Sequence, residues 1–337
     1  MKRILLALAA SALLAGAANA QLIAGDSYQI GSNLSAGQYP DGTALSNSGV
    51  LGAAGGTGNV LQTPGFLNGR YGGGSGTAQF AATSGGLAYA PFNDTSAGSG
   101  KVTFAPPSLD NVYRSTARTL SPSLTGSPIT TFYESALVNR GAVSTTTTGR
   151  DFVLAGFGNA SSNISVGTAG VTGLFFGFTG DAGNLAIRYR DNSNNGAGVI
   201  TETQLLNGAP TVDNATYALV FKIEQNYVGG TADRLTYWVN PTDPSSDTTL
   251  TATSLSTGVI TNDNILSSPG DFIRLNYVAH NYDSSAFFDE VNLGGNTPAS
   301  VTPNIQAGVV PEAGTISLLL TGGIALAGIV VRRRKTA

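Results

Sequence analysis

The chain has 337 residues, 45 of them glycine, no cysteine, and charged side chains at only 11% of positions. The absence of cysteine excludes disulfide bonds, thiolate metal sites and cysteine nucleophiles. A glycine-rich composition with low charge and sustained apolar alternation favours a folded domain of many turns and short strands over disorder.

The first twenty residues have the three parts of a secretory signal peptide. Lys2 and Arg3 form a basic start, residues 4–17 are apolar, and Ala18 and Ala20 frame an A-x-A cleavage site. We therefore predict that signal peptidase removes residues 1–20 and that the protein is exported.

The rest of the chain up to residue 293 reads as one large β domain. Residues 21–76 are rich in Gly and Ser and are expected to form short strands and loops that lead into it. Apolar or alternating runs bounded by Gly, Pro or Asn predict the later strands. These predicted strands are 77–80, 86–90, 101–104, 130–138, 152–157, 173–178, 184–190, 199–205, 217–224, 234–239, 272–277 and 286–293.

Period-two alternation predicts which side chains of a strand face the core. In residues 184–190, Leu185, Ile187 and Tyr189 lie on one side of the expected strand and Arg188 lies on the other. This strand is expected to pair with 199–205, and 217–224 with 234–239. The continuous apolar runs at 152–157 and 173–178 predict strands buried on both faces. Repeated strand–turn units without helical periodicity predict an all-β, antiparallel jelly-roll sandwich.

Four of these strands carry a resemblance. They contain Thr-Phe-Tyr-Glu-Ser-Ala-Leu-Val at 131–138, Tyr-Ala-Leu-Val-Phe-Lys-Ile at 217–223, Trp-Val-Asn-Pro at 238–241 and Phe-Asp-Glu-Val at 288–291. In this order they resemble the laminin-G-like, concanavalin A-like sandwich over about residues 77–294. The resemblance implies two packed sheets, but it transfers no binding site, because that fold hosts lectins, glycosidases and inert spacers alike.

Few residues suggest catalysis. His280 is the only histidine, so zinc, which needs several His or Cys ligands, is not expected. A Ser-His-Asp triad would have to use His280 without a Gly-x-Ser-x-Gly element. Glycosidases need two carboxylates across a cleft, and the neighbours Asp289 and Glu290 should point to opposite faces of a strand. We expect no enzyme, and a secreted polysaccharide-active hydrolase is the alternative.

Two kinds of ligand remain open. Four aspartates in predicted loops could hold structural calcium or cap turns, and we favour the role in turns. These aspartates are Asp181, Asp191, Asp243 and Asp247. Exposed aromatic side chains could bind carbohydrate, and the candidates are Trp238, Tyr237 and Tyr282. Because Trp238 and Tyr237 are neighbours on one strand they face opposite ways, so at least one is expected in the core.

The C-terminal residues 309–337 look like a membrane segment behind a linker at 294–308. Residues 315–331 carry no charge and are about long enough to span a bilayer, and a buried core helix is the alternative. A basic cluster follows, which would stay on the cytoplasmic side. It consists of Arg332, Arg333, Arg334 and Lys335.

Together these features resemble the PEP-CTERM sorting signal. Val310, Pro311 and Glu312 match the motif, and Ala313 departs from it, because the usual pattern has a second proline there. The resemblance implies an exported bacterial protein that a membrane protease called exosortase processes. It would pass through the inner membrane to the cell surface or extracellular matrix.

The net charge of the predicted exported domain limits the classes of partner that it can bind. Without the two terminal segments, Lys and Arg fall from 17 to 11 and Asp and Glu from 20 to 19, a net charge near −8. An acidic domain repels phosphate backbones, so nucleic acid is not an expected partner. The sequence therefore predicts a non-catalytic, exported surface or matrix protein, with exopolysaccharide as a candidate partner.

Overall fold

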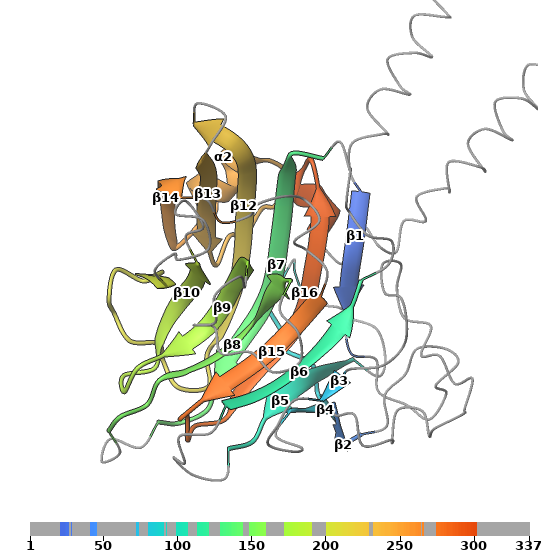
Figure 1. The fold of residues 1–337 in the computed structure, drawn as a ribbon, viewed down its shortest axis with the longest axis vertical. Helices are drawn as coiled ribbons and strands as arrows, with labels where there is room; N and C mark the ends of the chain where they lie inside the picture. The colour runs from blue at the N-terminus through green and yellow to red at the C-terminus, as the bar shows by residue number, and fades with distance from the viewer. Residues whose placement is uncertain are drawn as a thin grey trace, which may run out of the picture. The chain divides into compact units, whose positions relative to one another are not determined.

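The computed structural model describes most of the predicted domain in two antiparallel sheets (Figure 1). The described residues are 21–26, 28, 41–45, 72–73, 80–90, 92, 99–106, 113–120, 129–143, 148–159, 172–190, 200–228, 232–263, 265 and 274–301. The predicted signal peptide and the predicted sorting signal lie outside them. All strand pairs are antiparallel, so the predicted all-β antiparallel sandwich is confirmed.

Among the described residues, the first sheet has nine strands. In spatial order they are β14 (Ser256–Asp263), β13 (Ala232–Val239), β12 (Thr216–Val228), β7 (Thr131–Arg140), β16 (Ala286–Gly295), β5 (Gly100–Phe104), β4 (Phe80–Ser84) and β2 (Thr43–Ala44), and β1 (Gln21–Asp26) also pairs with β16.

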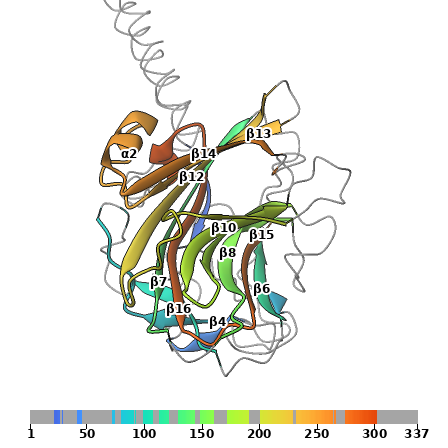
Figure 2. The same ribbon diagram turned by 90° about the vertical axis from the view of Figure 1, so that its left-hand side faces the viewer.

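The second sheet has seven strands in the part of the chain that the structure describes. In spatial order they are β11 (Ile200–Gln204), β10 (Asn184–Arg190), β9 (Gly173–Thr179), β8 (Phe152–Gly158), β15 (Arg274–His280), β6 (Tyr113–Thr119) and β3 (Gly72–Gly73). Figure 2 shows β10, β8, β15 and β6 in one layer, and β12, β7 and β16 in the other.

The main core lies between the two sheets. Leu185, Ile187 and Tyr189 of β10 all belong to it, so the predicted alternation of this strand is confirmed, and β12 contributes every second residue from Tyr217 to Ile223. Phe176 of β9 stacks on Phe221 of β12 with ring centroids 5.4 Å apart, which joins the layers directly. Every residue of β8 and β9 is buried, as their continuous apolar runs predict.

Several elements differ from the prediction. Residues 86–90 form a loop, and β4 starts at Phe80 and runs on to Ser84. The strands β6 and β14 and the helix α2 (Asp247–Thr253) were not predicted. The strands β6 and β14 are rich in Ser and Thr, and the seven residues of α2 include four threonines, so none shows a strong apolar period.

The folded domain extends beyond residue 293, where we expected it to end. Gly294 and Gly295 belong to β16, and the short 3₁₀ helix η3 (Pro298–Val301) follows. Val301 is fully buried, and Ser135 Oγ donates a hydrogen bond to its carbonyl at 2.6 Å. A Cβ at Gly294 would clash with Ser300, so glycine permits this close contact. The predicted linker therefore starts at least eight residues later than residue 294.

Candidate functional site

A network of polar side chains lies on the outer face of the second sheet. Strand pairing sets Arg188 of β10 directly opposite Glu202 of β11, and Arg188 Nε lies 2.5 Å from Glu202 Oε2. On the other side, Arg188 Nη2 lies 2.9 Å from Asp151 Oδ1, just before β8. Asp151 Oδ2 lies 2.8 Å from Nδ1 of His280, at the end of β15. Four elements thus contribute to one chain of contacts.

A buried apolar cluster underlies this network. Phe152, Leu154, Phe175 and Val278 form a separate buried cluster on the outer side of the sheet. The Arg188 guanidinium carbon lies 4.5 Å from the Phe152 ring centroid, and the His280 ring lies 6.0 Å from it. A cation over an aromatic face is attracted by the ring quadrupole, so Phe152 helps to hold Arg188 flat against the sheet.

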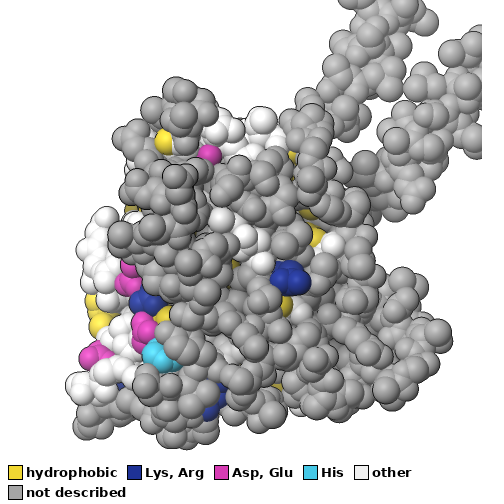
Figure 3. Space-filling model, viewed as in Figure 1, with side chains coloured by type: hydrophobic (Ala, Val, Ile, Leu, Met, Phe, Trp, Pro, Cys, Tyr) yellow, Lys and Arg dark blue, Asp and Glu magenta, His cyan; other side chains and the backbone are white. Residues whose placement is uncertain are grey.

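The network is partly open to solvent. The Asp151 and Glu202 side chains are 33% and 29% exposed, against 16% for Arg188 and 13% for His280. The carboxylates are therefore the more accessible members. In Figure 3 the chain's one histidine, in cyan, lies beside acidic and basic side chains on the face toward the viewer.

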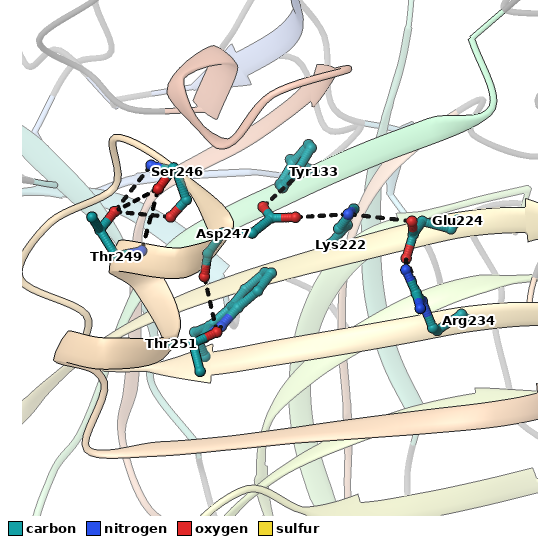
Figure 4. Close-up of polar contacts among 9 residues, drawn as sticks. Tyr133, Lys222, Glu224, Arg234, Ser246, Asp247, Thr249 and Thr251 are labelled. Carbon is teal, nitrogen blue, oxygen red and sulfur yellow. Dashed lines mark hydrogen bonds and ion pairs between the residues drawn. The ribbon is translucent and has the colours of Figure 1, made fainter.

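The outer face of the first sheet carries a second network, but it fastens a helix (Figure 4). Lys222 Nζ on β12 lies 2.7 Å from Asp247 Oδ2 and 3.2 Å from Glu224 Oε1. Tyr133 OH donates to Asp247 Oδ1 at 2.8 Å, and Glu224 Oε2 also binds Arg234 at 2.5 Å. Burial, with the Asp247 carboxylate, raises the Tyr133 pKa, so this phenol remains a donor. Asp247 is the first residue of α2, so the network ties that helix to the sheet.

The helix and η3 cover an apolar patch on this face. Trp238 is 1% exposed and packs in a cluster with Leu250 of α2 and Val301 of η3. Its Nε1 donates to Thr251 Oγ1 at 2.9 Å. The helix itself begins with a capping box between Ser246 and a threonine three residues later. Because α2 and η3 cover this apolar patch, we place the candidate site on the second sheet.

The structure corrects the predicted carbohydrate-binding aromatic residues. The exposed fractions of Trp238, Tyr237 and Tyr282 are 1%, 6% and 2%, so none offers a ring face to a sugar. Trp238 belongs to the outer cluster, and Tyr237 and Tyr282 belong to the main core. The expectation that Trp238 and Tyr237 face opposite ways is confirmed. The error was to take Trp238 as exposed, because the covering helix α2 was not predicted.

The adjacent acids on β16 serve the fold. Asp289 and Glu290 are 1% and 2% exposed. Asp289 accepts hydrogen bonds from the backbone N–H of Leu87 at 2.7 Å and of Glu290 at 2.9 Å. Glu290 has φ of +50°, in an irregular stretch of β16 between Asp289 and Asn292. A buried pair that holds a loop and a bulge does not line an open cleft.

The loop aspartates that were candidates for calcium each contact different residues. Asp243 accepts from the backbone N–H of Ser245, Asp181 accepts from that of Arg150, and Asp247 belongs to the α2 network. The Ser245 side chain and backbone lower the Asp243 pKa. Asp191 lies outside the described residues. Among those described, no three His, Asp or Glu side chains gather closely enough to hold a metal ion.

The predicted sorting residues also lie outside the described part of the chain. This applies to the signal peptidase site at Ala18 and Ala20, to residues 310–313, and to the basic cluster at 332–335. In the described segments no helix has both the length and the apolar character needed to span a bilayer.

A buried carboxyl group that the sequence analysis did not single out lies in the main core. Glu134 of β7 is fully buried on the inner face, between the two sheets. Its Oε1 accepts a hydrogen bond from the backbone N–H of Phe157 in β8 at 3.1 Å, and its Oε2 has no partner. Burial raises its pKa well above the usual value. Enclosed in the core, this group acts on stability and is not accessible to a ligand.

Sequence reasoning found only part of the outer network. It singled out His280 and placed Arg188 opposite the core side chains of its strand, but it missed Asp151 and Glu202. The predicted pairing of 184–190 with 199–205 could have identified Glu202. In the antiparallel register of these two strands, Glu202 lies opposite Arg188, and opposite charges across a strand pair attract. Asp151 comes from a loop before β8, and no periodicity marks it.

Comparison of the sequence with known protein families and with curated proteins finds no match. Solved structures do resemble the fold. An endo-β-1,4-glucuronan lyase from the fungus Trichoderma reesei is 13% identical and covers 71% of this chain and 96% of its own, with a TM-score of 0.44. A PL-14 alginate lyase from Aplysia kurodai is 11% identical over 64% and 86% of the two chains, with a TM-score of 0.35.

The exoplasmic/lumenal domain of VIP36, in a Ca²⁺/Man-bound form, is 8% identical over 66% and 80% of the two chains, with a TM-score of 0.36. Similarity at this level transfers neither activity nor ligand to this chain.

Proposed function

We propose that this chain is an exported bacterial surface or matrix protein that binds polysaccharide, without cleaving it, on the outer face of its second sheet. The observation that carries the proposal is the partly exposed network of Asp151, Arg188 and Glu202. Sugar-binding sites use a few convergent polar groups to fix the ligand, and this face supplies such groups above a rigid, buried apolar cluster.

The charges favour a neutral, hydroxyl-rich polysaccharide. Arg188 is held between two carboxylates, so one negative charge is in excess among these three side chains. Each carboxylate can accept about four hydrogen bonds and has only part of that capacity filled here. Sugar hydroxyls can donate to the remaining lone pairs, whereas a polyuronate would meet repulsion here and from the acidic domain.

Export is the second part of the proposal. The signal peptide would direct the chain outward, and the PEP-CTERM-like segment with Pro311 and Glu312 would deliver it to an exosortase. The membrane segment 315–331 would hold the chain in the inner membrane until processing releases it to the cell surface or matrix. Intact-mass measurement of the exported protein tests this. Loss of residues 1–20 and of the apolar tail supports the proposal, and a mature chain that keeps Arg332 to Lys335 contradicts exosortase processing.

Affinity electrophoresis in gels that contain one polysaccharide each tests the binding. We expect retardation by a neutral polysaccharide and little by alginate. The double variant D151N/E202Q keeps the side-chain shapes but removes both charges, and it should lose the retardation. A matched control is D247N, which makes the same change on the covered face. Equal retardation of all three proteins, or of none, contradicts a site on the second sheet.

A second candidate function is a polysaccharide-active enzyme. The observation in its favour is the contact between His280 Nδ1 and Asp151, because a carboxylate often orients a catalytic imidazole. Release of new reducing ends from a polysaccharide panel tests it. Sustained release that is lost in both H280Q and D151N would establish the enzyme and overturn the non-catalytic proposal.

A further inference from the structure

The free edges of the two sheets are not equally protected. An edge strand exposes unpaired N–H and C=O groups, and proteins usually guard it with short length, charge or a covering segment. The edges β2 and β3 have two residues each, and β11 has five with the charged Glu202 at its centre. The remaining edge near β1 is covered, since Ile23 and Ala24 are buried and η3 packs against that strand.

Strand β14 is the exception. It ends the first sheet, has eight residues, and carries no charge before Asp263 at its end (Figure 1). Within the described part of the chain its backbone pairs only with β13. Val259 at its middle is 59% exposed, and Leu255 just before it is 66% exposed. A long, uncharged edge with exposed apolar side chains can accept another strand.

The strand is firmly placed in its own sheet. Ile260 packs against the main core, and Ser256 Oγ donates to the carbonyl of Leu205. Gly258 lies against the Tyr237 ring, where a Cβ would clash. These contacts fix which residues face outward, namely Thr257, Val259 and Thr261. The edge is therefore a preformed surface.

We propose that β14 pairs antiparallel with β14 of a second copy of this chain, about a two-fold axis through Val259. Such an axis, perpendicular to the sheet, makes the contact self-complementary and keeps outward side chains on the same face in both copies. Val259 then faces its counterpart, and Thr257 faces Thr261 of the other copy. Cross-strand pairs of β-branched side chains are favourable, and no like charges oppose one another, because Asp263 falls opposite Leu255.

The central position of the exposed Val259 and the absence of opposed like charges in this register are the argument for a second copy rather than an unrelated strand. The pairing joins two first sheets edge to edge and leaves both second sheets uncovered. It is independent of the proposed polysaccharide site, and either can fail alone.

Cysteine cross-linking of the full chain tests the register, because the natural sequence has no cysteine. The variant V259C should form a disulfide-linked dimer under mild oxidation. The matched control is V212C, since Val212 is also an exposed valine, at 66%, but lies outside β14. Cross-linking of V259C alone supports the proposal, and equal cross-linking of both variants, or of neither, overturns it.

A charge-pattern experiment tests the pairing without cross-links. In T257K/T261K, lysines of the two copies oppose each other, so sedimentation should show one copy per particle. In T257K/T261E, each introduced lysine faces an introduced glutamate, so the dimer should remain. Circular dichroism verifies that both variants fold. A monomeric wild-type chain, or the same assembly state in both variants, overturns the proposal.

Discussion

The two outer faces of the sandwich use similar residues for different purposes. On the first sheet, Lys222 lies between Asp247 and Glu224, and the network ends by fastening α2 over Trp238. On the second sheet, Arg188 lies between Asp151 and Glu202, and Asp151 is about as open to solvent as Asp247, with exposed fractions of 33% and 39%. An ion-paired cluster therefore does not identify a binding site by itself. What distinguishes the two is that Asp247 belongs to a helix that packs over its sheet, whereas the contacts of Arg188 come from the second sheet's own strands and the residue before β8.

The largest expected effect is on the covered face. W238A removes a buried indole from the cluster with Leu250 and Val301, and truncations of this size cost about 3–5 kcal/mol of unfolding free energy. Guanidinium unfolding would measure the loss. Polysaccharide binding by the fraction that remains folded should be unchanged, because Trp238 is on the other sheet. A cost below about 1 kcal/mol would mean that the helix does not seal this face.

The carboxyl group between the sheets should make stability depend on pH in an unusual direction. Burial raises the folded pKa of Glu134, whereas the unfolded value is about 4.3. The native state therefore keeps a proton that the unfolded chain has lost. Its contribution to stability is fully present below about pH 4.3, and it is lost as pH rises toward the folded pKa, by about 1.4 kcal/mol per pH unit.

The variant E134Q isolates this effect, because glutamine does not titrate. Guanidinium unfolding of both proteins at pH 5, 7 and 9 would show the variant gaining stability relative to the wild type as pH rises. The hydrogen bond from the Phe157 N–H can be kept by the amide oxygen, so the fold should be preserved. Stability curves that stay parallel across this range would show that the two states bind protons at Glu134 alike.

The strand pattern was predictable wherever one side of a strand faced the main core. In residues 184–190 and 217–224 every second side chain is large and apolar because the inner face of each strand must be apolar, so the sequence pattern predicts which side chains are buried. Strand β14 and helix α2 are held by edge pairing, a capping box and one buried leucine, which leave little periodicity. The outer network depends on register and on one loop residue, Asp151. Such long-range contacts are not visible in a local pattern.

The smallest expected effects on stability come from replacing one aspartate by alanine on each outer face. D247A removes the Asp247 contacts to Lys222 and Tyr133 and the acid at the start of α2, and should cost about 1–2 kcal/mol of unfolding free energy. D151A removes a partly exposed ion pair, and Arg188 keeps its second partner Glu202, so its cost should stay below about 1 kcal/mol while polysaccharide binding is lost. Unfolding midpoints and affinity electrophoresis of the two variants would measure both quantities. If D151A were the more destabilising and binding persisted, the Arg188 network would be a fastening like that of Lys222, and the distinction between a covered and a binding face would fail.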